Sequence, residues 1–255
     1  SAPRLAEHKM GKQKVYFFDT YQYTRWFPNS FQWEFCPGDV TYVPKYPSIV
    51  KSRPLMSDNE NSVILKLDKV RHFIFVNDKK KFAEKKDMII FRGKVKGKPS
   101  RKKFMEMYFG NPMCDLGDVS KNTPDPVAWQ TEKKTIREHL NYKFIMALEG
   151  NDVASNLKWV MSSNSIAIMP RPTCETWFME GMLIPDYHYI EIKPDFSDLE
   201  EKANYYIKHI DKAQEIINHA HEYVAQFKDR NREELISLLV LDKYFRVTGQ
   251  IKDEI

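Results

Sequence analysis

Short apolar runs alternate with longer amphipathic segments from Asp87 onward. The apolar runs are too short for helices and too continuous for exposed strands, which is typical of strands buried on both faces. The expected strands are 88–91, 144–148, 166–169 and 189–192. The expected helices between them are 100–109, 154–161 and 175–182. This order predicts an α/β fold in which crossover helices cover a parallel, nucleotide-binding sheet.

The two ends of the chain differ in their pattern of apolar, aromatic and proline residues. In 199–227 apolar residues recur at steps of three and four, which predicts two amphipathic helices that cover a sheet face, and a last helix follows near 235–245. In 1–86 aromatic residues are frequent and prolines interrupt the chain, so that short strands and ordered loops are expected there. We therefore expect three parts: an N-terminal lobe 1–86, a Rossmann-like lobe 87–228 and a C-terminal helix 229–255.

Length and composition agree with a globular protein. The chain has 255 residues, of which 42% are apolar, so it can bury a sizeable core. It contains no apolar stretch of the roughly 20 residues needed to span a bilayer, and its first residues lack the apolar segment of a signal peptide. Cys36, Cys114 and Cys174 are widely spaced and fit neither a disulfide framework nor a zinc site. A cytoplasmic location is the expectation.

The net charge of +5 is modest and is concentrated in runs such as 79–81 and 101–103. Such runs are either solvated surface or sites that attract phosphate-bearing sugars or an anionic membrane face. They lack the interleaved aromatic residues of a nucleic-acid stacking surface. His209, His219 and His221 do not form a metal site by spacing, because positions two apart on a helix do not face each other.

Residues that directly follow the expected strands are the candidates for ligand binding, because ligands of such sheets lie beyond the carboxyl ends of the strands. Arg92 and Gly93 follow the first strand and form either a phosphate contact or an ordinary turn. The run 149–158 leads from a strand into a helix, where its first residues either cap the helix or hold a diphosphate. Glu175 either accepts the hydroxyls of a ribose or complements a helix dipole.

Several of these motifs together resemble glycosyltransferase family 90. The resemblance is carried by Phe91-Arg92-Gly93, by Glu149-Gly150-Asn151-Asp152-Val153-Ala154-Ser155-Asn156-Leu157-Lys158-Trp159, by Glu175-Thr176-Trp177-Phe178 and by His188-Tyr189-Ile190. The resemblance extends more weakly from Gly38 to Gln250. The residues of the second motif look like those of the bacterial, lipopolysaccharide-A-type branch. The family implies a two-lobed GT-B fold, a nucleoside-diphosphate sugar donor that is usually UDP-linked, and inversion at the anomeric carbon without an obligatory metal. An N-terminal lobe of 86 residues is short for that fold, so it is either incomplete or pared down.

The resemblance also implies roles for individual residues. Arg92 with Gly93 would contact the donor diphosphate, and Glu175 would hold the ribose. The nucleotide would be cradled by Gly150, Asn151, Asp152, Val153, Ala154, Ser155 and Asn156. Asn156 stands where the animal enzymes of the family have a phosphate-binding arginine, and Lys158 or Arg171 would compensate. The bacterial branch implies a lipopolysaccharide core or related surface glycan as the acceptor, at the inner face of the inner membrane.

Inverting transfer needs a carboxylate that accepts the proton of the acceptor hydroxyl. Asp39 is the candidate base, because Lys51 to Pro54 after it resembles the family's segment behind the base; Asp39 is equally suited to a turn. Asp68 and Asp58 are alternatives. Lys51 and Arg53 are candidate contacts of the leaving diphosphate.

Two other functions compete with this one. Metal-dependent transferases of the GT-A type usually carry an Asp-x-Asp triplet, and this sequence has none; Asp115 and Asp118 have the wrong spacing and are expected at a strand end and turn. A non-catalytic module that binds nucleotide sugars or glycans remains open because the base is uncertain. Turnover distinguishes a module from an enzyme.

Overall fold

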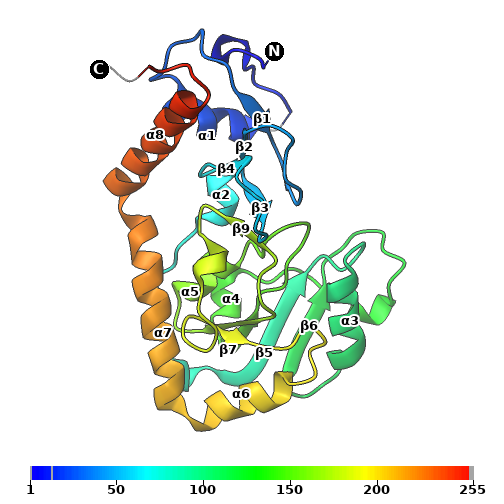
Figure 1. The fold of residues 1–255 in the computed structure, drawn as a ribbon. Helices are drawn as coiled ribbons and strands as arrows, with labels where there is room; N and C mark the ends of the chain where they lie inside the picture. Colours follow the sequence, from blue (N-terminus) through cyan, green and yellow to red (C-terminus); the bar gives the residue numbers. More distant parts are fainter. Residues whose placement is uncertain (1, 13, 253–255) are drawn as a thin grey trace. The chain divides into compact units, whose positions relative to one another are not determined.

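The computed structural model describes residues 2–12 and 14–252, which form two compact units (Figure 1). Unit 1 takes its described residues from Ser1–Ile74, Thr173–Met182 and Ala225–Ile255, and unit 2 from Phe75–Pro172 and Leu183–Val224. The division differs from the three contiguous parts expected from the sequence, because the chain returns twice to unit 1. Long-range strand pairing and helix packing, which local periodicity does not reveal, cause these returns.

Unit 1 contains a parallel sheet with strand order β1-β2-β4 and an antiparallel pair of β3 with β9. Its strands are β1 (Glu34–Cys36), β2 (Ser48–Val50), β3 (Ser52–Pro54), β4 (Ser62–Ile64) and β9 (Cys174–Thr176). Its helices are α1 (Lys14–Thr24), α2 (Lys69–His72) and α8 (Arg230–Val247). The short strands agree with the proline-interrupted sequence of this region.

Helix α1 is a correction to the expected strands and loops of 1–86. It buries Tyr16, Asp19, Thr20 and Tyr23 on one face, and the hydroxyl of Thr20 donates to the carbonyl of Tyr16 at 2.8 Å. The aromatic density that suggested strands is instead distributed around a helix. Propensity is a weak guide where tertiary burial decides the conformation.

Unit 2 is built on a five-stranded parallel sheet with the order β10-β8-β7-β5-β6. Figure 1 labels three of these strands, β5, β6 and β7. Its strands are β5 (Lys86–Gly93), β6 (Cys114–Asp118), β7 (Tyr142–Met146), β8 (Ile166–Met169) and β10 (Ile190–Glu191). Its helices are α3 (Pro99–Tyr108), α4 (Ile136–His139), α5 (Leu157–Met161), α6 (Leu199–Lys208) and α7 (Ile210–Ala225). In chain order this sheet is 2-1-3-4-5, a doubly wound arrangement whose direction of winding switches between β5 and β7. The predicted α/β class and parallel sheet are confirmed.

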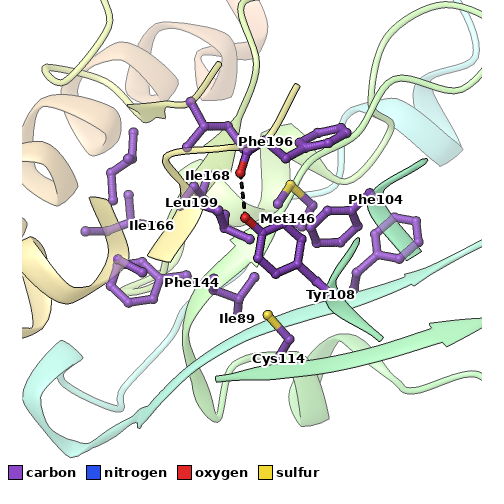
Figure 2. Close-up of a cluster of buried hydrophobic side chains, with 14 of the residues drawn as sticks. Ile89, Phe104, Tyr108, Cys114, Phe144, Met146, Ile166, Ile168, Phe196 and Leu199 are labelled. Atoms are coloured by element: carbon purple, nitrogen blue, oxygen red, sulfur yellow. Dashed lines mark hydrogen bonds between the residues drawn. The ribbon is translucent and has the colours of Figure 1, made fainter. Parts of the chain in front are cut away.

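Alternate residues of these strands form the core of unit 2. Ile89, Phe144, Met146, Ile166 and Ile168 project to one face and pack with residues of α3 and α6 (Figure 2). On that face the hydroxyl of Tyr108 donates to the carbonyl of Phe196 at 2.6 Å, which satisfies the polar end of an otherwise apolar contact. The intervening residues Ile90, Ile145 and Ala167 are buried as well. Burial on both faces explains the continuous apolar runs in the sequence.

Two expected helices need correction. The segment expected to be helical from Ala154 begins its helix only at Leu157. The segment expected to be helical from Glu175 to Met182 contains strand β9 and a single turn of 3-10 helix, Glu180–Met182. Glu175 pairs with Arg53 of β3 across the ladder, and this long-range partner overrides the local sequence.

Among the helices that the structure describes, none is both long enough and apolar enough to cross a membrane. The three cysteines are free. Cys114 packs in the core of unit 2, where burial raises the pKa of its thiol to about 12. A thiol in this environment stays protonated and has a packing role.

Candidate functional site

A cavity of about 350 Å³ lies in unit 2 at the carboxyl ends of β5 and β7. Its walls come from the end of β5, from the segment after β7, and from α3, α4 and α5. The lining residues are Phe91, Arg92, Gly93, Lys94, Arg101, Lys134, Ile136, His139, Met146, Leu148, Ser155, Asn156 and Trp159. Strands β5 and β7 flank the point where the sheet reverses its winding, which is where open α/β sheets bind their ligands. The volume is that of a small-molecule site.

The cavity is strongly cationic. Arg92, Lys94, Arg101 and Lys134 contribute guanidinium and ammonium groups, and its lining residues, drawn from the described part of the chain, include no carboxylate. Hydrophobic residues such as Trp159 and Met146 complete the wall. Several cations beside an apolar surface, without acidic side chains, favour a ligand that joins an anionic group to a ring.

Arg92 is held in place before any ligand arrives. Its Nη1 donates to the carbonyls of Phe91 at 2.9 Å and Asp115 at 2.8 Å, and its Nη2 pairs with the carboxylate of Asp115. Tyr142 donates its hydroxyl to the other oxygen of that carboxylate. Burial opposes ionisation of Asp115, but the hydrogen bonds from Tyr142 and Arg92 lower its pKa below the ordinary value. Burial and the bond to Asp115 raise the pKa of Tyr142 to about 12, so this network keeps one fixed charge pattern at neutral pH.

Arg101 ties the two strand ends together. From the first turn of α3 its Nε donates to Glu149 O at 3.0 Å, its Nη2 to Leu148 O at 2.8 Å, and its Nη1 to Lys94 O at 3.0 Å. Its guanidinium also lies over the ring of Phe91, 5.8 Å from the centroid. Burial lowers the pKa of Arg101. The ordinary pKa of arginine is so high that the guanidinium nevertheless stays charged. The residue therefore supplies positive charge and fixes the backbone on both sides of the switch point.

The ring of Phe91 and the guanidinium of Arg101 limit the space at the two glycines of the motifs. A Cβ atom at Gly93 would lie 2.6 Å from Phe91 Cζ and 3.3 Å from Arg101 Nη1. A Cβ atom at Gly150 would lie 3.3 Å from Arg101 Nη2. Glycine at both positions leaves room for the guanidinium between the strand ends.

The loop 150–156 partly lines the cavity. Ser155 and Asn156 face it, and the Asn156 side chain donates to the carbonyl of Met146 at 3.1 Å, which anchors the loop to the end of β7. Asp152, Val153 and Ala154 are buried, whereas Asn151 is exposed and pairs with Lys98. The helix that follows has only five residues, so the expected anion site at a helix N-terminus has little dipole behind it.

Two proposed phosphate contacts of unit 2 lie elsewhere than in this lining. Lys158 is completely buried in α5. Arg171 is 74% exposed and lies 3.7 Å from the carboxylate of Glu191. Neither lines the cavity, whose cationic side chains are those of Arg92, Lys94, Arg101 and Lys134.

His139 adds a titratable group to the cavity wall. Its Nδ1 donates to the carbonyl of Thr135 at 2.8 Å, and its ring meets Trp159 edge to face at 5.6 Å. Burial lowers the pKa of His139, and the charge of Arg92 acts in the same direction. The neutral ring is therefore favoured at pH 7, which leaves Nε2 as a hydrogen-bond acceptor.

In unit 1 the structure brings the candidate base Asp39 together with Lys51, Arg71 and Asp68. Asp39 is paired with the buried ammonium of Lys51, and Arg71 Nη2 lies 3.5 Å from the same carboxylate. Arg71 also contacts Asp68 at 2.8 Å. Asp39 is 23% exposed, whereas the Asp68 side chain is only 10% exposed. Burial raises the pKa of Asp68, against the opposing charges of Arg71 and Lys51.

These environments separate the three candidate carboxylates. Asp39 keeps access to solvent beside two cations, Asp68 is enclosed at the start of α2, and Asp58 is exposed in the segment between β3 and β4. Lys66 and Asp68 are both buried, so these two charges do not belong to a solvated surface. A proton acceptor must be reached by the acceptor hydroxyl, and of the two carboxylates that contact Arg71, Asp39 is the more accessible.

The motif around Glu175 belongs to unit 1. Arg53 Nε and Nη2 both contact Glu175 Oε1, at 2.8 and 2.7 Å. Trp177 Nε1 donates to Glu233 Oε2 at 2.7 Å, and Lys66 Nζ contacts the same oxygen at 2.8 Å. These buried bonds give the motif a clear structural role in joining β3 and β9 to α8.

Sequence reasoning did not single out Arg101, Lys134 or His139, and it named Trp159 only as the last residue of a motif. Arg101 stands in the basic run 101–103, which the sequence left open as solvated surface or as a site for phosphate-bearing sugars, and its position in the first turn of the helix after a strand is a usable signal. Lys134 and His139 stand in a polar segment without periodicity, and no local pattern pointed to them. Among residues 2–12 and 14–252, no group of three or more His, Cys, Asp or Glu residues is placed to hold a metal ion.

Comparison with known proteins decides the family. The model described as glycosyl transferase family 90 matches residues 61–243. The chain belongs to glycosyltransferase family 90. It is also 39% identical over 246 residues to the O-glucosyltransferase LpsA of Dichelobacter nodosus, an alignment that covers 96% of this chain and 76% of that protein. The predicted family and the predicted enzyme class are confirmed, so this family 90 chain is a glycosyltransferase.

Proposed function

We propose that this family 90 enzyme transfers a sugar from a nucleoside-diphosphate donor, UDP-linked, to a bacterial surface glycan such as a lipopolysaccharide core. The single observation that carries the donor class is the cationic cavity at the switch point of unit 2. Arg92 and Arg101 present guanidinium groups that suit the oxygens of a diphosphate, while Trp159 and Met146 offer apolar surface for a ring. Because the relative is named an O-glucosyltransferase, UDP-glucose is the first donor to test.

For the reaction we propose single displacement with inversion, without an obligatory metal. Asp39 would accept the proton of the acceptor hydroxyl while that oxygen attacks the anomeric carbon and the bond to the diphosphate breaks. Negative charge then develops on the leaving diphosphate, which fixed cations stabilise. Lys51, Arg53 and Arg71 are the cations of unit 1 suited to this role, Arg92 and Arg101 those of unit 2. The GT-B arrangement of two lobes, with unit 2 as the donor lobe, belongs to the same proposal, as does work at the inner face of the inner membrane.

The donor class is tested by calorimetric titration of the chain with UDP-glucose, other UDP sugars, GDP sugars and UDP alone. We expect binding of the UDP compounds, because the cavity offers both cationic and apolar walls. UDP should retain most of the affinity if the diphosphate and nucleoside carry recognition. Absence of binding to every nucleotide would refute the donor assignment.

Replacing Arg92 by alanine should weaken UDP binding by about tenfold or more, because a pinned guanidinium is lost beside the diphosphate. The matched control is Arg137→Ala, which removes an exposed arginine of α4 that does not line the cavity. Both are measured by titration with UDP, together with thermal unfolding. Equal affinities of the Arg92 variant and the unmodified chain would place the diphosphate elsewhere.

A further inference from the structure

The exposed face of α1 combines aromatic and cationic side chains in one stripe. Lys14, Phe18 and Tyr21 of α1, and Arg25 directly after its end, follow one another at steps of four, three and four residues. They lie on the same side, because the N–H of Arg25 donates to the carbonyl of Tyr21 at 3.3 Å and continues the helical turn, and all four are exposed. Phe18 is 59% and Tyr21 50% exposed. Two large rings in solvent, between a lysine at one end and an arginine at the other, are unusual for a face that contacts only water.

Neighbouring residues extend this surface. Trp26 follows the stripe directly and is 68% exposed, the guanidinium of Arg25 lies 5.0 Å from the centroid of its ring, and Met10 before the helix is 51% exposed. We call Met10, Lys14, Phe18, Tyr21, Arg25 and Trp26 the α1 surface. Lys9 and Lys12 add further exposed positive charge next to it.

The charge of this region has a single sign. Asp19 is the only acidic residue between His8 and Ser30. It is buried on the opposite face, where its carboxylate accepts from the backbone N–H of Lys69 at 3.1 Å. α1 therefore presents cations and rings to solvent without a carboxylate of its own, and the neighbouring carboxylate of Glu234 in α8 accepts from Gln22 at 3.4 Å.

Two rings of the α1 surface contact Phe17 within the helix. Phe17 stacks on Tyr21 with centroids 5.6 Å apart and an interplanar angle of 8°, and it meets Phe18 edge to face at 5.6 Å. The buried face, with Tyr16 and Tyr23, fixes the helix itself. Contacts of this kind restrict Phe18 and Tyr21, which reduces the conformational entropy that they lose on entering another medium.

We propose that the α1 surface docks this enzyme on an anionic phospholipid bilayer. Aromatic rings with polar edges favour the interface between headgroups and acyl chains, and lysine and arginine beside them are attracted to anionic headgroups. Phe18 and Trp26 enter the interface, while Lys14 and Arg25 meet the phosphates. The helix lies along the interface and does not cross it. The inference concerns a surface distinct from the cavity and does not depend on the proposed reaction.

The test is co-sedimentation of the chain, without donor or acceptor, with vesicles of phosphatidylglycerol and phosphatidylethanolamine or of phosphatidylcholine alone. We expect binding to the anionic vesicles and a reduction by about tenfold in Phe18→Ser/Trp26→Ser and in Lys14→Gln/Arg25→Gln. The matched controls are Tyr205→Ser/Ile210→Ser and Lys102→Gln/Lys103→Gln, which remove exposed rings, apolar groups or lysines of unit 2. These controls should bind as the unmodified chain does.

Three outcomes overturn the proposal. They are absence of binding to anionic vesicles, equal binding to phosphatidylcholine, and loss of binding that is as large in the controls as in the α1 variants. Thermal unfolding of each variant checks that the fold is retained. If the ring variant unfolds, the charge variant still tests the proposal, because it keeps every ring in place. UDP titration of the same samples separates a failure of docking from a failure of the donor site.

Discussion

Replacing Asp39 by asparagine is expected to reduce sugar transfer by a factor of about 10² to 10⁴ while UDP binding stays within about twofold of the unmodified value. Asparagine keeps the size of the side chain and an oxygen that can accept from Lys51, but it has no carboxylate to take up the proton. Measuring kcat with UDP-glucose and an isolated lipopolysaccharide-core acceptor, beside UDP titration, separates chemistry from binding. A normal rate in this variant would show that the base is another residue.

The other carboxylates of unit 1 provide the controls. Asp58→Asn alters an exposed group and should leave the rate unchanged. Asp68→Asn alters the enclosed partner of Arg71, so it should affect stability more than chemistry. If the Asp68 variant loses transfer at unchanged stability while the Asp39 variant does not, the raised pKa of Asp68 would mark it as the group that exchanges the proton.

Replacing Arg101 by methionine is expected to weaken UDP binding by at least about tenfold and to lower the free energy of unfolding by about 3 kcal/mol. Methionine has a similar length but leaves the carbonyls of Lys94, Leu148 and Glu149 without their charged donor. Both effects follow from one cause, because the same bonds that join the strand ends also shape the cavity. UDP titration and chemical denaturation measure them.

Two variants frame this result. Lys102→Met changes the neighbouring residue, whose side chain is 53% exposed, and should leave affinity and stability unchanged. Arg101→Lys keeps the charge but cannot reproduce the planar fork that serves three carbonyls, so only part of the loss should be recovered. Full recovery in the lysine variant would mean that charge alone is needed; no effect in the methionine variant would remove Arg101 from the site.

The structure also changes the meaning of the recognised motifs. Glu175 and Trp177 stand in one motif of the family, yet their side chains are bonded to Arg53 and to Glu233 within unit 1. A role of Glu175 toward ribose stays a prediction. To bind ribose, Glu175 would have to do so while it is paired with Arg53, or give up that pairing. Conversely Arg101, which no motif marked, occupies the centre of the switch point.

The sequence by itself determined the α/β class and the family. It also located three strands: 88–91 lies within β5, 166–169 coincides with β8, and 144–148 overlaps β7 and runs directly beyond its end. It could do so because burial on both faces imposes continuous apolar runs that are visible locally. Only the tertiary structure decided which charges meet. The helix α1, the pair of β3 with β9, the cluster of Asp39 with Lys51, and the three carbonyls around Arg101 depend on residues far apart in the chain. The sequence gives the charge of each side chain. Which oppositely charged group it meets is decided by the packing that brings distant segments together.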